Sequence, residues 1–324
     1  MRRFRSFLAP QLREYITYRQ HLGYAKSPLT SHLRTFDRYL KEQKSAPGLL
    51  QPSFFLELRQ DLKLEARSVN EILSTVRVFF QFMVRRGYYA QNPLKDIPPL
   101  VQGTAVPFVF SPRQADQLLN AVGKRLRKTH HRFLTDLAIY TAIVLMARCG
   151  MRIKEPLRLL RSDYRSAERT VYIEKTKFKK DRLIPVPESV AVEIENYLAV
   201  RSALLCDDQN PYLLAGKRQK PLRDYQVRRR FHQAVQDIAL SRPRQVIGNM
   251  IFSAPTPHSL RHSFAISTLR RIQQRGRSPQ NALPVLATYM GHSEYKHTLK
   301  YLKFVDAEQR QGLADFVSSQ NEQL

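Results

Sequence analysis

A proline-rich passage, QNPLKDIPPLVQGTAVPFVF at 91–110, most constrains how this chain can fold. Its four prolines fix φ and lack a backbone N–H, so they interrupt any helix. Helical periodicity is present on both sides of the passage and absent within it. We therefore expect two domains, residues 1–100 and 111–324, joined by a linker at 101–110.

The first domain is predicted to be helical. In TSHLRTFDRYLKEQ, for example, Leu33, Phe36 and Leu40 recur at the spacing of one helix face. Helices are expected at 12–23, 30–43 and 69–87, and the first and last of these end at a glycine.

The second domain begins with a strong helix-start signal. Ser111 is the expected N-cap, Pro112 occupies the first helical position, and Gln114 completes a capping box. A long apolar helix is expected at 130–149, and a short helix is expected to begin near Ile153.

Two β-rich runs, at 169–175 and 182–187, flank the lysine-rich segment TKFKKD and predict a hairpin. The fold class is therefore expected to be mainly α with a small antiparallel β-sheet. No element is assigned to 241–255. The remaining helices are expected at 188–205, 221–240, 258–271, 281–290, 293–303 and 306–318.

Charge is the strongest compositional feature. The chain has 54 Lys and Arg residues against 27 Asp and Glu, a formal net charge of +27. Such a field favours a polyanion, and duplex DNA is the best match because of its dense phosphate charge. The positive charge is spread over the body of the chain rather than gathered on one amphipathic helix, so we expect no membrane partner. A basic ribosome-associated protein is the alternative from charge alone.

Cysteine usage and hydropathy indicate a soluble, cytoplasmic protein. Cys149 and Cys206 lie far apart and form no CxxC pair, so neither a zinc cluster nor a disulfide framework is expected. The longest apolar run, at 137–147, is too short to span a bilayer, and the N-terminus lacks the apolar core of a secretory signal.

Several polar side chains occur where helices and turns present them to a cleft. Arg152 follows a helix-ending glycine, and the lysines of TKFKKD lie at a hairpin turn. His258 and Arg261 share one face at a helix N-terminus, which favours an anion. Taken singly, each is equally consistent with a solvated arginine, an exposed turn or a capping histidine.

Together these residue types suit phosphodiester cleavage. That reaction needs fixed cations on the phosphate oxygens, a nucleophile, a base and a proton donor. Arginine, imidazole and ammonium groups can supply the charge that a magnesium ion supplies elsewhere. The sequence has no clustered acidic triad, HExxH or P-loop, so we expect neither a metal nor another cofactor.

The ordered set GMRIKE, TKFKKDRLIPVP, HSLRH and GHS, followed by a tyrosine, resembles the tyrosine recombinases, the phage integrase family. The resemblance covers about 107–305. It implies a catalytic domain there, with a helical, SAM-like core-binding domain before it that binds DNA. It also implies a C-terminal tail helix at about 305–319 that docks on a neighbouring subunit.

The resemblance assigns a role to each matching residue. Arg152 and Arg261 would clamp the scissile phosphate, with Glu155 orienting the first arginine, and Lys177 would protonate the departing 5′-oxygen. Pro156 is an unusual residue after Glu155 and leaves the subfamily open.

The histidines are assigned in the same way. His258 would accept the proton of the nucleophile, His292 would donate to the phosphate, and His262, which follows Arg261, would be a supporting residue. The segment at 271–284 is given no role.

Three tyrosines near the C-terminus compete for the role of nucleophile. On a helical wheel Tyr295 shares a stripe with Leu299 and Leu302 and is therefore expected to be buried. Tyr301 lies on another side of that helix and is expected to face the cleft. Family spacing from the GHS histidine also selects Tyr301, and Tyr289 is expected to pack.

The resemblance therefore implies a site-specific recombinase or integrase of a mobile element. It would cleave and rejoin duplex DNA through a 3′-phosphotyrosine on Tyr301, as a homotetramer on two paired sites, with or without accessory proteins. Two alternatives stay open, a non-cleaving DNA-binding accessory protein and a relaxing type IB topoisomerase. The sequence does not identify the DNA site.

Overall fold

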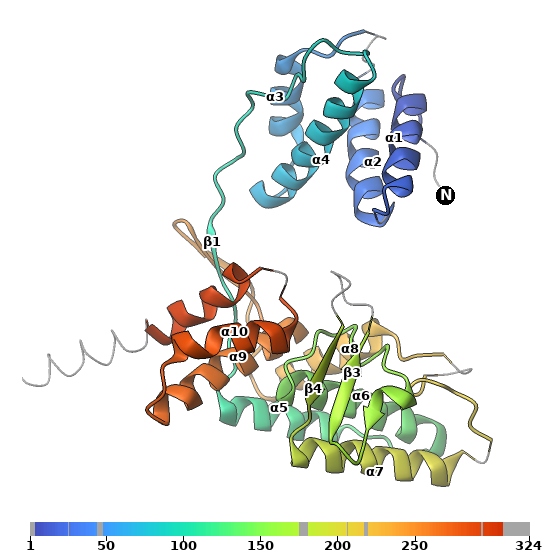
Figure 1. Cartoon of the computed structure of the whole chain (residues 1–324), viewed down its shortest axis with the longest axis vertical. Coiled ribbons are helices and arrows are strands. Elements are labelled where there is room, and N and C mark those ends of the chain that lie inside the picture. Colours follow the sequence, from blue (N-terminus) through green and yellow to red (C-terminus); the bar gives the residue numbers. More distant parts are fainter. Residues whose placement is uncertain are drawn as a thin grey trace, which may run out of the picture. The chain divides into compact units, whose positions relative to one another are not determined.

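The computed structural model describes residues 4–24, 26–43, 48–174, 181–205, 207–216, 220–292 and 294–306. The chain divides into two compact units, Met1–Thr104 and Ala105–Leu324 (Figure 1). The boundary falls where the proline-rich passage interrupts the helical pattern. Each unit has a hydrophobic core of its own.

The first unit is a bundle of helices. They are α1 (Ala9–His21), α2 (Lys26–Glu42), α3 (Pro52–Asp61) and α4 (Ala66–Arg85). Three of them match the expected helices, whereas α3 was not predicted. Only ten residues long, it shows too few turns for a clear period, although Pro52 marks its first position.

Aromatic rings fill the centre of this bundle. The ring of Phe80 lies 5.2 Å from those of Phe55 and Phe79 and 5.0 Å from that of Tyr89, in edge-on geometry. Edge-to-face pairs add to the burial of apolar area, so this cluster is a main source of stability for the unit.

The second unit is also largely helical. Its α-helices are α5 (Pro112–Lys124), α6 (His130–Arg148), α7 (Glu188–Leu204), α8 (Asp224–Asp237), α9 (Pro257–Gln274) and α10 (Pro279–Met290). Four of these helices, α5, α7, α8 and α9, pack against a fifth, α6. Residues 296–306 are helical as well. The capping box predicted at Ser111 is confirmed, since its side chain accepts from the N–H of Gln114. Among the described residues, no helix is both long and apolar enough to cross a membrane.

Two small sheets complete this unit. The predicted hairpin is confirmed in β3 (Thr170–Ile173) and β4 (Arg182–Pro185), which pair antiparallel, with β2 (Tyr164–Arg165) next to β3 after a short 3₁₀ turn at Arg161–Asp163. The second sheet has the order β1 (Thr104–Val106), β6 (Met250–Phe252), β5 (Gln245–Ile247). The prediction of a mainly α fold with a small antiparallel sheet is confirmed.

The β5–β6 hairpin occupies the segment to which no element was assigned. A two-residue turn, Gly248 and Asn249, joins its strands, and Gly248 has a φ of 58°. A glycine-asparagine pair between apolar runs is a hairpin signal. It was available in the sequence.

A buried arginine ties α7 to the loop that follows it. Arg201 is almost fully buried and forms an ion pair with Asp208, with Nε 2.6 Å from a carboxylate oxygen. It also donates to the carbonyls of Asn210, Tyr212 and Leu213. The network satisfies the buried guanidinium and joins two segments of the domain.

We expect Phe80→Ala to destabilise the first unit by about 3–5 kcal/mol, because it removes a fully buried ring and leaves a cavity. Hydrogen exchange of the α4 amides in the full chain measures the loss. Val78→Ala, on the same helix but 43% exposed, is the control and should leave exchange nearly unchanged. Equal effects of the two substitutions would contradict the assignment of the core.

Candidate active site

Three arginine side chains from separate segments meet at the carboxyl end of α10. The helix ends at Gly291, whose φ of 62° is the left-handed conformation of a C-cap. The last carbonyls of a helix lack partners within it and carry partial negative charge, so they attract cations. The carbonyls of Tyr289, Met290 and Gly291 accept hydrogen bonds from Arg182, Arg261 and Arg152, respectively. The helix end therefore holds three guanidinium groups together.

Arg152 is brought to this point by the way α6 ends. Gly150 has a φ of 61°, and a Cβ there would collide with the ring of Phe264, so glycine is required for two reasons. The chain then turns, and Nη2 of Arg152 lies 2.7 Å from the carbonyl oxygen of Gly291. The Arg152 side chain is 27% exposed, which leaves part of its guanidinium open to a ligand.

The prediction of a short helix beginning near Ile153 is wrong. Residues 153–158 form turns instead. Pro156 lacks the N–H that an α-helix would need to bond to the carbonyl of Arg152, so the helix cannot form.

A single carboxylate, Glu155, joins two of the arginines. Its Oε1 lies 2.8 Å from Nη1 of Arg152, and its Oε2 accepts from the backbone N–H of Arg152 and from Nη2 of Arg182, at 2.8 and 2.9 Å. Burial would raise the pKa of this carboxyl, but Arg182 in particular holds the pKa below its usual value. Glu155 is therefore an anion that orients both guanidinium groups.

Arg261 lies near the start of α9, whose N-cap is Thr256 and whose first residue is Pro257. Its side chain is almost fully buried, and its Nη1 donates to the carbonyl of Gly150 at 2.7 Å. Burial, followed by the charge of Arg152, lowers its pKa to about 9. Arg261 nevertheless stays protonated at neutral pH.

Two histidines of α9 and Tyr301 lie in contact beside this cluster. Nδ1 of His262 and the hydroxyl of Tyr301 share a hydrogen bond of 3.0 Å, whose direction depends on the tautomer. The ring of His258 lies edge-on to that of His262, with centroids 4.5 Å apart. His258 also reaches solvent, whereas His262 and Tyr301 are buried.

Their surroundings suppress charge on all three groups. Desolvation, and then Arg261, lowers the pKa of His258 to about 4. Burial, and then His258, lowers the pKa of His262 to about 2. Burial raises the pKa of Tyr301 to about 12, although Arg261 and Arg152 act against it. At neutral pH the site therefore holds neutral imidazoles and a neutral phenol.

His292 also lies beside Tyr301. Their ring centroids are 6.2 Å apart, and Nδ1 of His292 is 2.8 Å from Oγ1 of Thr298, which is fully buried. Burial, and then Arg261, lowers the pKa of His292 to about 3. When the Thr298 hydroxyl donates to Nδ1, the ring carries its proton on Nε2 and can donate from there.

The helical-wheel prediction for the tyrosines is wrong. Tyr295 is 45% exposed and Leu299 is exposed as well, whereas Tyr301 is 1% exposed. The buried stripe of residues 296–306 contains Thr298, Tyr301 and Val305, at i, i+3 and i+7. Thr298 is polar, so the hydrophobic pattern did not reveal this stripe.

The expectation for Tyr289 is confirmed. Its ring stacks on that of Phe264 with centroids 5.5 Å apart, and burial raises its pKa. It packs between α9 and α10 and contributes its carbonyl, rather than its hydroxyl, to the arginine cluster.

The structure thus brings most of the predicted residues together. Lys177 and the tail beyond residue 306 lie outside the described residues. Two cations were missed, Arg182 and Lys300, whose ammonium lies 5.2 Å from the centre of the Tyr301 ring. For Arg182, the only signal in the sequence was its inward position on the strand. For Lys300, the only signal was that it directly precedes Tyr301.

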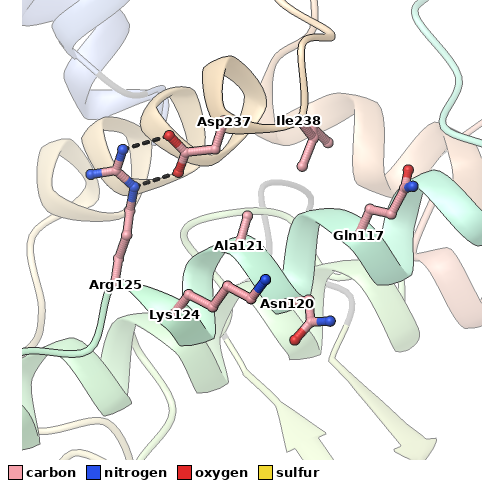
Figure 2. Close-up of a pocket in the computed structure, with 7 residues that line it drawn as sticks. All are labelled: Gln117, Asn120, Ala121, Lys124, Arg125, Asp237 and Ile238. Carbon is pink, nitrogen blue, oxygen red and sulfur yellow. Dashed lines mark hydrogen bonds and ion pairs between the residues drawn. The ribbon is translucent and has the colours of Figure 1, made fainter.

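A hollow lies elsewhere, between α5 and α8. This cavity of about 460 Å³ is lined by Gln117, Asn120, Ala121, Lys124, Arg125, Asp237 and Ile238. In Figure 2 the Arg125 guanidinium faces the Asp237 carboxylate at one end of the cavity, and the two groups form a bidentate ion pair. Its one arginine is neutralised in this way, and its lining has neither the clustered arginines nor the imidazoles and buried tyrosine found at the end of α10.

Comparison with known proteins gives the same picture. The model of the phage integrase family matches residues 109–308. A putative integrase/recombinase of Sinorhizobium fredii, y4rE, is 28% identical over 303 residues, covering 93% of each chain. The tyrosine recombinase XerD of Lacticaseibacillus casei is 27% identical over 288 residues, covering 86% of this chain and 88% of that protein.

Solved structures share the fold at low identity. The XerH recombinase bound to palindromic difH in a post-cleavage complex superposes with a TM-score of 0.68 at 17% identity, covering 94% of this chain and 84% of that one. A lambda integrase dimer bound to a core site gives a TM-score of 0.65 at 16% identity, covering 91% and 76%. Since the family model spans more than half of the chain, the protein belongs to the phage integrase family, the tyrosine-type site-specific DNA recombinases.

Proposed function

We propose that this site-specific recombinase cleaves and rejoins duplex DNA through a 3′-phosphotyrosine bond on Tyr301, without a metal or ATP. The observation that carries the proposal is the convergence of Arg152 and Arg261 on one helix end, next to a buried tyrosine in contact with an imidazole. Cations that bind phosphate, a nucleophile and candidate bases are thereby within one site.

The two arginines bind the scissile phosphate. A guanidinium has five N–H donors, so Arg152 and Arg261 keep donors beyond those engaged by the backbone carbonyls and Glu155. Their planar forks match phosphate oxygens, and their charge stabilises the additional negative charge of the pentacovalent transition state. His292 adds a donor from Nε2 in the tautomer favoured by Thr298.

Cleavage then follows with a balanced transfer of protons. The Tyr301 oxygen attacks phosphorus while its proton passes to an imidazole, and the bond to the 5′-oxygen breaks. His262 is the ring in contact with the hydroxyl, and His258 lies against it on the solvent side, so the proton leaves through this pair. Lys177 supplies the proton to the departing oxygen. Attack by a 5′-hydroxyl on the phosphotyrosine reverses these steps and rejoins the strand.

The partners follow from the same reaction. The catalytic domain and the helical domain at 1–100 bind duplex DNA, and four protomers act on two paired sites through exchange of the tail helix at about 305–319. The lambda integrase structures that support this include a tetramer bound to a Holliday junction. A transposon integrase in complex with DNA, of TM-score 0.60 at 20% identity, supports a role in a mobile element. Such a recombinase acts at the nucleoid in the cytoplasm, with or without accessory proteins.

We expect Tyr301→Phe to abolish a covalent protein–DNA adduct while leaving DNA binding intact, because only the attacking oxygen is removed. Adducts trapped in cells by wild-type protein are recovered with their DNA, and sequencing identifies the site. A nicked duplex carrying that site is then used to measure adduct formation on denaturing gels. Tyr295→Phe, at an exposed tyrosine six residues earlier, is the control and should form the adduct normally. An adduct that persists in Tyr301→Phe would refute the assignment.

We also expect the stability of the catalytic domain to fall on acidification. The pKa of His262 is lower in the folded state than in the unfolded state, so the unfolded chain binds the proton first. The stabilisation is complete above about pH 6.5 and is lost as the pH falls toward the folded value, by about 1–3 kcal/mol at pH 4.5. Urea titrations of the full chain followed by circular dichroism measure this slope.

His262→Gln should flatten that dependence, because glutamine can still bond to Tyr301 but does not titrate. His21→Gln, at an exposed histidine at the end of α1 in the other unit, is the control and should keep the wild-type slope. A His262→Gln protein with the same pH dependence as the wild type would contradict the explanation.

A further inference from the structure

Arg182 is the member of the arginine cluster to which the family pattern assigned no role. It is the first residue of β4 and is buried. Its Nε donates to the carbonyl of Tyr289 at 2.8 Å, and its Nη2 donates to Oε2 of Glu155 at 2.9 Å. Its Nη1 is buried and has no hydrogen-bond partner among the described residues. An arginine in this setting is held entirely by protein groups.

We propose that Arg182 is a positioning residue for DNA cleavage, which holds Glu155 and the end of α10 so that Arg152 is fixed for the phosphate. The inference rests on the proposed function. Arg182 itself does not contact DNA in this role, because its guanidinium is buried behind the groups that it bonds.

The first argument concerns the charge of Glu155. A buried carboxylate is costly unless it is paired, and this one is shared between Arg152 and Arg182. Arg182 is the strongest of the charges that hold the Glu155 pKa down. Without it the carboxylate would be less favoured, and Arg152, whose side chain is partly exposed, would lose the partner that orients it.

The second argument concerns the shape of the turn at the end of α10. A Cβ at Gly291 would lie 2.8 Å from Nη1 of Arg182 and 3.1 Å from its Cζ. The flat guanidinium therefore lies against bare backbone, close to the carbonyls that accept from Arg261 and Arg152. The left-handed φ of Gly291 and the room for Arg182 require the same glycine, so turn and arginine form one unit.

The third argument is that only arginine fits both partners. The fork of a guanidinium donates to a carbonyl and a carboxylate at once, whereas the single ammonium of lysine on a flexible stem cannot hold both in the same geometry. We therefore expect Arg182→Lys to be folded but slow. A displacement of a catalytic group by about 1 Å can cost about 100-fold in rate.

The experiment compares Arg182→Lys with Arg201→Lys in the full chain. Arg201 is a matched control because it is also buried, pairs with one aspartate and donates to carbonyls, but bonds to none of the site residues. We expect Arg182→Lys to form the adduct about 100-fold more slowly than wild type, with unchanged affinity for the duplex. Arg201→Lys should react at close to the wild-type rate below its melting temperature. Equal rates for the two variants would overturn the proposal.

A double-mutant cycle tests the route through Glu155. If Arg182 acts by holding this carboxylate, Glu155→Gln and Arg182→Lys together should be little slower than the slower single variant, because residues acting as one unit are not additive. If the rate loss of the double variant equals the product of the two single losses, the two residues act independently and that route is refuted.

A substrate with a 5′-bridging sulfur separates this role from one exerted on the hairpin that contains Lys177. A thiolate leaves without a proton donor, so such a substrate relieves a defect in proton donation. We expect Arg182→Lys to stay slow on it, and recovery to the wild-type rate would place the effect on Lys177 instead. If wild-type protein itself forms no adduct on either substrate, the proposed function fails. If it reacts and Arg182→Lys reacts equally fast, only the role of Arg182 fails.

Discussion

The site depends on how three positive side chains are held close together. Arg152, Arg182 and Arg261 repel one another, and among the described residues Glu155 is the carboxylate that bonds to two of them, Arg152 and Arg182. The carboxyl end of α10 supplies further negative potential, because three successive carbonyls each accept from one of them. Gly291 makes this possible by turning the chain at the helix end.

Holding cations with carbonyl groups has a chemical advantage over holding them with carboxylates. A carbonyl dipole fixes the direction of a guanidinium but leaves its full charge in place. A second buried acid beside Arg261 would neutralise the cluster and repel a phosphodiester. The arrangement therefore keeps the cluster ordered before DNA arrives and cationic enough to bind it, which is the preorganisation that electrostatic catalysis requires.

Local and ordered features of the chain were predictable from sequence, whereas long-range contacts were not. The cap at Ser111 and the pairing of β3 with β4 depend on neighbouring residues, and the structure has them as expected. The order of motifs identified the family. The contacts of Arg182 could not be predicted, because its partners are a carbonyl and a carboxylate that are distant in sequence. Any residue can supply a backbone carbonyl, so the sequence does not show which one accepts the bond.

The prediction of which face of the last helix carries Tyr301 failed for a related reason. A helical wheel weighs apolar side chains, but the buried face of residues 296–306 begins with Thr298, which is buried because it bonds to His292. The polar contacts of a site can thus reverse the face that hydrophobicity alone would select. The proposed nucleophile lies on the inner face of this helix, where it bonds to His262.

In the proposed function, burial also keeps the site unreactive until DNA is bound. The shifted pKa values of Tyr301, His258 and His262 all favour the uncharged form of the side chain. The phenol therefore does not ionise at neutral pH, and the imidazoles are weak bases. A phosphodiester brings the missing negative charge, which partly offsets Arg152 and Arg261 and raises the pKa of nearby imidazoles. The group that is attacked therefore also makes the proton acceptors more basic. The substrate itself completes the acid–base machinery, and the tyrosine stays inert toward solvent in its absence.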